Sequence, residues 1–148
     1  LILLELVSFI WPTKPRSLDY PATLKIHPLK KKHNFSKIII DSIPVNHGNI
    51  DSKCFIINSN CAYVSDAKLI YENYINSFKN LKYLIIDCLR YKEHPSHFSL
   101  NEVIELVKKI KPKKTILTNL HTDMDYKTLK KILPSNIVPA YDGLKLKL

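Results

Sequence analysis

Histidine and aspartate side chains that can ligate a metal follow the apolar, strand-like segments of this sequence. His47 follows the first such segment, Asp66 the third, His94 and His97 the fourth, and His121 the fifth. In layered α/β folds the loops that leave strand ends gather at one edge of the sheet, where ligands bind. The pattern therefore favours a ligand-binding edge at which these residues meet.

The elements that must position these residues alternate between strand and helix, which predicts an α/β fold. Strands are expected at residues 37–45, 53–57, 61–65, 83–87, 115–118 and 137–141. An apolar stripe at helical spacing predicts a helix over residues 67–80 and consists of Ala67, Ile70, Tyr74 and Phe78. A capping box at residues 99–102 predicts the start of a second helix that ends before Pro112, and Asp125 is expected to cap a third.

The length of 148 residues is that of a single domain, here expected to span residues 1–148. Residues 1–11 are predicted to form an amphipathic helix, too short to cross a membrane and without signal-peptide features, and prolines make residues 12–28 a connector. The first residue is Leu rather than Met, which marks either an unusual start codon or an N-terminally truncated domain. Three cysteines without CxxC spacing favour a reducing, cytoplasmic location, and they are Cys54, Cys61 and Cys88.

The net charge of +10 comes from lysine, because only Arg16 and Arg90 of the 23 basic residues are arginines. Proteins that read bases or clamp phosphates rely on the planar fork of arginine. The lysine excess therefore favours compositional drift over a specific nucleic-acid surface, and any nucleic-acid binding should be non-specific.

Several motifs together resemble the metallo-β-lactamase superfamily, in its phosphoribosyl cyclic phosphodiesterase-like branch. Pro-Val-Asn-His-Gly at residues 44–48 is similar to that family's P-V-x-H-G element, and Ala-Tyr-Val-Ser-Asp at 62–66 is similar to its Y-x-S-D element. The similarity continues over nearly the whole chain, at residues 94–100, 117–126 and 139–144. It implies a partial αββα sandwich.

The resemblance also implies a site for two divalent metal ions, zinc or manganese, in a complete family member. His47 would ligate one metal, Asp66 would bridge both, and His121 would supply a further ligand. Many relatives have that last ligand two residues earlier, where this chain has Asn119, so His121 is assigned as a shifted equivalent. Two such metals clamp the attacking and leaving oxygens of a phosphoester. Gly48 would let the backbone approach the site closely.

Other roles are open for several of these residues. His97 is the candidate catalytic residue for phosphate contact or leaving-group protonation, but it could instead support the helix start beside it. Loss of metal on its replacement would make it a ligand or a structural support. Asp66 could also cap a helix that starts at Ala67. Asp87 and Asp142 could hydrogen-bond to the ligand imidazoles and orient them, or merely end their strands.

The family's H-x-H-x-D-H element, which supplies most of the metal ligands, has no counterpart here, since the sequence contains no His-x-His pair. Without that half, an apolar sheet face and a sheet edge should be exposed. The resemblance implies a metal-dependent hydrolase of the phosphodiesterase type, acting on a small-molecule phosphoester without a membrane partner. The chain alone is expected not to hold two zinc ions, and a separate chain carrying the missing N-terminal part is a possible partner. The alternatives are a non-catalytic remnant or one half of a split hydrolase, and a non-specific nucleic-acid-associated basic protein.

Overall fold

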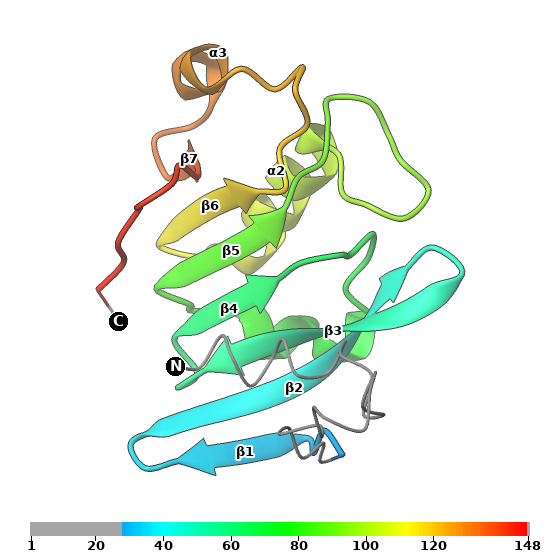
Figure 1. Cartoon of the computed structure of the whole chain (residues 1–148), viewed down its shortest axis with the longest axis vertical. Helices are drawn as coiled ribbons and strands as arrows, with labels where there is room; N and C mark the ends of the chain where they lie inside the picture. The colour runs from blue at the N-terminus through cyan, green and yellow to red at the C-terminus, as the bar shows by residue number, and fades with distance from the viewer. Residues whose placement is uncertain (1–27, 148) are drawn as a thin grey trace, which may run out of the picture. The chain divides into compact units, whose positions relative to one another are not determined.

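A single mixed β-sheet, with strands in chain order, organises the part of the protein that the computed structural model describes, residues 28–147 (Figure 1). The residues from Lys31 onward form one compact unit. The predicted helix at residues 1–11 and nearly all of the connector lie outside the described residues. Seven strands are described, and they are β1 (Lys32–Phe35), β2 (Ile38–His47), β3 (Ile50–Ile57), β4 (Cys61–Val64), β5 (Tyr83–Asp87), β6 (Lys114–Thr118) and β7 (Ile137–Pro139). The predicted strands and the α/β class are therefore confirmed, with β1 added.

Strand direction explains why one edge of the sheet collects the polar residues. Strands β1 to β4 are antiparallel neighbours, whereas β4 to β7 are parallel. Because β2 and β4 are both antiparallel to β3, the strands β2, β4, β5 and β6 all point the same way. Their carboxyl ends share one edge, as is usual for ligand sites in sheets with parallel strands.

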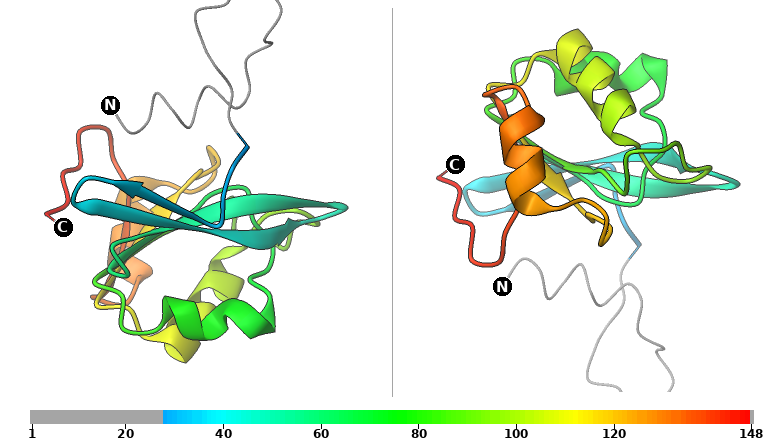
Figure 2. Two further views of the ribbon diagram at one scale, coloured as in Figure 1. Left: turned by 90° about the horizontal axis from the view of Figure 1, so that it is seen from below. Right: turned by 90° about the horizontal axis from the view of Figure 1, so that it is seen from above.

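The connections between the parallel strands are the 3-10 helix η1 (Glu72–Phe78) and the helices α2 (Leu100–Ile110) and α3 (Tyr126–Ile132). Figure 2 shows α2 and η1 covering one face of the sheet. The core lies between them, where Val45, Val64, Ile86 and Leu117 of the sheet are fully buried with Val103 of α2. Among the described residues, no helix is long and apolar enough to cross a membrane.

The opposite face of the sheet carries a second apolar row that does not belong to this core. Cross-strand pairing aligns Phe55, Tyr63, Ile85, Ile116 and Val138 across five strands. Tyr63 in this row is 40% exposed. The row is apolar, as expected from the missing motif, but Ile116 within it is buried, so the expected exposure does not hold along the whole row.

The predicted helix at residues 67–80 is wrong in its first half, because only η1 is helical there. The chain after Asp66 instead runs beside the end of β2, where the Asn46 amide donates to the Leu69 carbonyl at 2.9 Å and the Lys68 amide donates to the Asn46 carbonyl at 2.7 Å. These long-range hydrogen bonds replace the local helical ones. Ala67 and Phe78 are still buried, so the stripe correctly marked core positions but not the backbone conformation.

The two helix starts read from the sequence are confirmed. The Glu102 carboxylate accepts hydrogen bonds from the Ser99 amide at 2.8 Å and from the Ser99 hydroxyl at 2.7 Å, as part of the capping box of α2. Asp125 caps α3, where its carboxylate accepts from the Thr128 amide at 2.8 Å. Helix α2 therefore starts directly after the loop that carries His94 and His97.

Candidate metal centre

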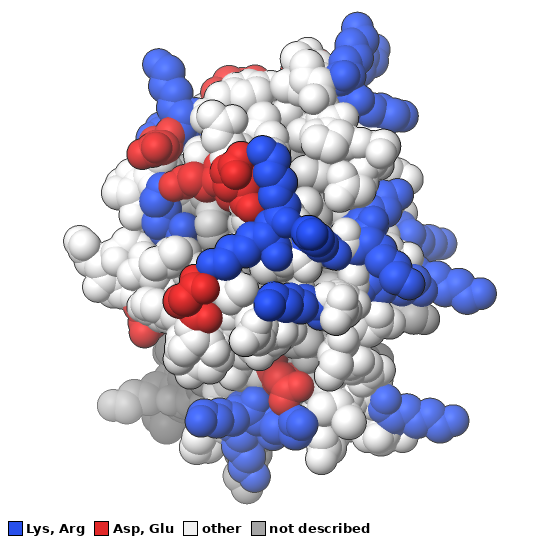
Figure 3. Space-filling view, turned by 180° about the vertical axis from the view of Figure 1, so that it is seen from behind, with Lys and Arg blue, Asp and Glu red and all other residues white. Residues whose placement is uncertain are grey.

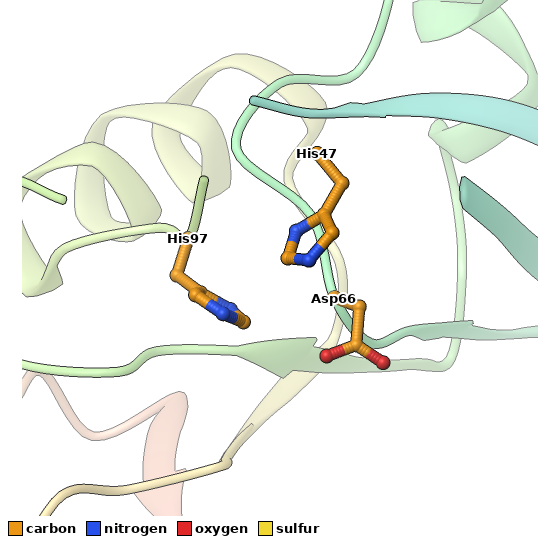
Figure 4. Close-up of side chains that lie close together, drawn as sticks. All are labelled: His47, Asp66 and His97. Carbon is orange, nitrogen blue, oxygen red and sulfur yellow. The ribbon is translucent and has the colours of Figure 1, made fainter. Parts of the chain in front are cut away.

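His47, Asp66 and His97 come together at the carboxyl edge of the sheet. One possible ligand atom from each lies within 4.8 Å of the others. His47 is the last residue of β2, Asp66 follows β4, and His97 comes from the loop between β5 and α2. Figure 4 shows the ring of His97 directed toward the other two side chains. Two imidazoles and a carboxylate form a donor set that suits zinc and related divalent ions.

Backbone hydrogen bonds hold these three segments against one another. The hydrogen bonds between Asn46 and residues 68 and 69 fix the loop of Asp66 beside the end of β2. The Phe98 amide donates to the Ala67 carbonyl at 2.9 Å and thereby ties the His97 loop to the Asp66 loop. Asp66 itself has a left-handed backbone, with φ of 48°. Such a conformation costs energy for a residue with a side chain and is often found at functional sites.

The structure contradicts the interpretation of Asp66 as a helix cap. Ala67 does not begin a helix, and the nearest helical turn starts five positions later at Glu72. Instead the Asp66 carbonyl accepts a hydrogen bond from the Ser52 hydroxyl at 2.6 Å, and its side chain is exposed. The Asp66 carboxylate is therefore not used to cap a helix at Ala67.

Both imidazoles are oriented by oxygen acceptors at Nδ1. The Nδ1 of His47 lies 2.7 Å from the Ser96 carbonyl oxygen, and the Nδ1 of His97 lies 2.5 Å from the Asp87 carboxylate. A carbonyl can only accept, so Nδ1 of His47 carries the proton, and the Asp87 carboxylate favours the same tautomer in His97. The free lone pair of each neutral ring is then on Nε2. Histidines that ligate metals are commonly held in this way.

Asp87 reaches His97 from the end of β5, and its predicted role of orienting ligand imidazoles stays a prediction. Its side chain is completely buried, and the same carboxylate oxygen also accepts from the Ala67 amide at 3.2 Å. Burial raises the pKa of Asp87, against the opposing effect of the hydrogen bond with His97. The second oxygen, Oδ1, has no hydrogen-bond partner among the described residues.

Gly48 allows the close approach that the sequence predicted. A Cβ atom at this position would lie 3.0 Å from the Ser96 Cβ and 3.4 Å from the Pro95 carbonyl oxygen. The backbone of Gly48 also has φ of 73°, a conformation that glycine adopts without strain. A glycine is therefore needed where the end of β2 passes the loop that orients His47.

Other predicted site residues lie outside this group. His121 is exposed, and its Nδ1 pairs with the Asp123 carboxylate at 2.8 Å. Asn119, two residues earlier, has φ of 57° and an exposed side chain. Asp142 is exposed in the turn before Gly143. The roles assigned to His121 and Asp142 therefore remain predictions without support from these contacts.

His94 neighbours the group but points its Nδ1 elsewhere. This nitrogen lies 3.3 Å from the Ser96 amide and 3.2 Å from the Ser96 hydroxyl, while the ring centre lies 5.1 Å from that of His97. Desolvation and the nearby Arg90 charge lower the pKa of His94. His94 therefore contributes to the structure of the loop.

The place of His97 in the group was only partly visible in the sequence, which marked it as a catalytic candidate. The signal that could have linked it to the ligands was Asp87, a buried carboxylate ten residues earlier at a strand end. Its partner could not be identified without knowing the path of the loop.

Several solved structures are similar to this chain in fold. No family model matches the sequence. A diphosphatase of the PhnP family has a TM-score of 0.82 and 28% identity, and the match covers 86% of this chain and 50% of that one. The metallo-β-lactamase fold protein YhfI from Bacillus subtilis has a TM-score of 0.70 and 18% identity, with 84% and 56% covered. The short form of human tRNase Z has a TM-score of 0.58 and 14% identity, with 77% and 46% covered.

One curated protein is similar in sequence over a small part of its length. The octanoyltransferase of Porphyromonas gingivalis (strain ATCC BAA-308 / W83) is 31% identical over 137 residues, which covers 88% of this chain but 27% of that protein. This chain therefore spans about half the length of the solved PhnP-family structure and about a quarter of the curated relative. The similarity to these solved structures establishes that the described part of this chain has the fold of the metallo-β-lactamase superfamily.

Proposed function

We propose that this chain is part of a metal-dependent hydrolase that cleaves a small-molecule phosphoester, with His47 and Asp66 as metal ligands. The observation that carries the proposal is the group of His47, Asp66 and His97 at the carboxyl edge of the sheet. The similarity to a PhnP-family diphosphatase supports hydrolysis at a phosphate group over the other reactions that this fold performs. A fold alone would not support it, because one fold serves many chemistries.

The residues of this chain would serve the reaction by binding and orientation. A divalent metal held here would lower the pKa of a bound water and provide hydroxide near neutral pH. His47 is held for this role by the Ser96 carbonyl and His97 by the Asp87 carboxylate. The exposed carboxylate of Asp66 is free to bind one metal or to bridge two.

The proposed reaction needs more ligands than this chain supplies for a two-metal site. Catalytic zinc ions use about three protein ligands each. The match to the PhnP-family diphosphatase covers 50% of that protein, so the other half of that protein has no counterpart in this chain. We therefore include in the proposal a further polypeptide segment that brings the remaining donors. The apolar row around Tyr63 is a surface on which such a segment could pack. The octanoyltransferase similarity does not add acyl transfer, since it covers 27% of that protein.

The lysine excess does not support nucleic-acid binding as a second function. Figure 3 shows lysine and arginine side chains gathered from the middle to the right side of one face of the molecule, with acidic groups mainly to their left. Lys68, Lys108 and Lys109 each pair with a glutamate.

The test is to measure zinc content by mass spectrometry and hydrolysis of bis-p-nitrophenyl phosphate. The chain is assayed alone and after mixing with the segment of the PhnP-family diphosphatase that it does not match. We expect negligible turnover from the chain alone, and turnover with two zinc ions from the assembled pair. Asp66→Asn in the same assembly should lose both. Size-exclusion chromatography shows whether the two parts have assembled.

An assembled, zinc-loaded pair without turnover would refute the phosphodiesterase proposal. Two zinc ions and real turnover in the isolated chain would show that the ligands have been misplaced.

A further inference from the structure

We propose that the groove at the C-terminal end of α2 is a docking site for an acidic, amphipathic helical segment of another protein. The groove has a volume of about 440 Å³ and lies between α2 and the residues that lead from α3 into β7. Its polar lining residues are Lys108, Lys111 and Asn136. The rest of the lining is apolar and consists of Ile104, Val107, Pro112, Pro134 and Ile137. The proposal concerns a surface apart from the candidate metal centre and does not depend on the proposed function.

The groove lies at the edge of the sheet opposite the candidate metal centre. Helix α2 begins at Leu100, directly after the loop of His97, and ends at Ile110 beside the groove. Because α2 returns the chain from the end of β5 to the start of β6, its C-terminal end lies near the amino ends of the parallel strands. An 11-residue helix is about 16 Å long. A partner bound in the groove therefore leaves the metal centre open.

The charge around the groove is positive, which calls for an acidic partner. Among the described residues that line it, Lys108 and Lys111 are basic and none is acidic. Lys108 pairs with Glu105 at 2.6 Å. Lys111 and the exposed Lys113 and Lys114 that follow it form no ion pair within the described part of the chain. Figure 3 shows lysine side chains gathered on the face of the molecule that α2 covers. Complementary charges speed association and select the partner.

The shape of the groove suits a protein segment better than a small molecule. Lys108, Lys111 and Pro134 are exposed and Ile104 is half-buried, so the groove is open to solvent. Small-molecule sites bury most of the surface of their ligand, which an open groove does not do. Nucleic acid would contact the lysines through its phosphates but would leave the apolar lining unused.

The lining also favours a helix over an extended segment as the occupant. An extended segment binds by pairing with the backbone of an edge strand. The edge strand beside the groove is β7, which has three residues and ends at Pro139, a residue without an amide hydrogen. Few backbone groups are therefore offered there. A helix instead places apolar side chains at i, i+3, i+4 and i+7 into such a groove, with acidic side chains on its flanks facing the lysines.

The experiment titrates the full 148-residue chain into a fluorescein-labelled synthetic helical peptide and follows fluorescence anisotropy. The peptide consists of leucine, alanine and glutamate, with all leucines on one face. A peptide of the same composition with scattered leucines and a labelled single-stranded DNA are the comparison probes. We expect the amphipathic peptide to bind about tenfold or more tightly than the scattered one, because only it buries a continuous apolar face. In ¹H–¹⁵N NMR spectra the largest shifts should fall at Val107, Lys111 and Ile137, with His47 and Tyr63 unchanged.

Two pairs of substitutions separate specific contacts from general charge and apolarity. Lys111→Gly removes one ammonium group at a position whose left-handed backbone, with φ of 52°, suits glycine. It should weaken peptide binding about 2–5-fold. Lys109→Gln is its control, because Lys109 pairs with Glu72 and does not line the groove. Ile104→Gln should weaken binding about fivefold or more, whereas Ile50→Gln, at an exposed position on the opposite edge of the sheet, should not.

Equal weakening by Lys111→Gly and Lys109→Gln would overturn the proposal, since net charge alone would then explain binding. It would also fail if the amphipathic peptide did not bind, bound no more tightly than the scattered one, or bound more weakly than the DNA. NMR shifts centred on Tyr63 or His47 would place the peptide on another surface and refute the groove. Circular dichroism establishes that each variant is folded. If Ile104→Gln proves unfolded, the Lys111→Gly comparison and the NMR shifts still decide the question.

Discussion

Replacing Gly48 by alanine should loosen the candidate metal centre without touching any ligand. The new Cβ would lie 3.0 Å from the Ser96 Cβ, which is tighter than most real Cβ contacts, so Ser96 has to shift by a few tenths of an ångström. The carbonyl of Ser96 is the group that orients His47 at 2.7 Å. The substitution therefore disturbs the hydrogen bond that holds His47.

Gly143→Ala is the control, because it separates backbone strain from the steric contact. Its φ of 87° is similarly left-handed, but a Cβ there would meet nothing within 4 Å. The left-handed conformation costs about 1–2 kcal/mol, partly offset by about 0.4–1 kcal/mol from the less flexible unfolded chain. Overpacking against Ser96 adds about 1–3 kcal/mol at position 48 alone. We expect a loss of about 1–4.6 kcal/mol for Gly48→Ala and about 0–1.6 kcal/mol for Gly143→Ala.

Urea unfolding of the metal-free chains, followed by circular dichroism, measures the stability difference. Competition with a chromogenic chelator measures zinc affinity, which should fall about 10–100-fold for Gly48→Ala because an orienting contact is disturbed. Gly143→Ala should leave zinc affinity unchanged. Equal loss of stability in the two variants, or unchanged zinc affinity in Gly48→Ala, would refute the argument from close packing.

Three further predictions concern the supporting contacts and the charge. Asp87→Asn should weaken zinc binding about 10–100-fold, since the amide holds His97 less firmly than a carboxylate; equal affinity in chelator competition would contradict this. Burial by itself would raise the pKa of Glu102, but hydrogen bonds from Lys68 and Ser99 hold it below 4.5. The stability from these contacts is therefore present above pH 4.5 and is lost as the pH falls through the lower folded pKa of Glu102. Urea unfolding of Glu102→Gln should lack this loss, which we expect to be about 1 kcal/mol or less because the pair is only partly buried. Binding to nucleic acid, measured by fluorescence anisotropy, should be weak, independent of sequence and abolished by moderate salt, and tight salt-resistant binding would count against the hydrolase proposal.

The sequence by itself determined six of the seven described strands, two of the helix starts and the superfamily. Strand positions could be read because the apolar segments are short and bounded by turn residues. The starts of α2 and α3 could be read because the capping contacts of Ser99 and Asp125 are made within a few residues. The motifs around His47 and Asp66 indicated the superfamily, and the similarity to a solved structure supports it.

Only the tertiary structure decided how the residues of the site are grouped. The helix expected from Ala67 onward is replaced by hydrogen bonds to Asn46, a residue 21 positions away from Ala67 along the chain, and local periodicity carries no information about such contacts. The loop that joins β5 to α2 brings His97 to Asp87 and to the ligands, whereas His121 pairs with Asp123 away from the group. Side chains at a common sheet edge are predictable from strand direction. Which of them face the same point depends on loop paths fixed by long-range backbone hydrogen bonds and by the close approach at Gly48.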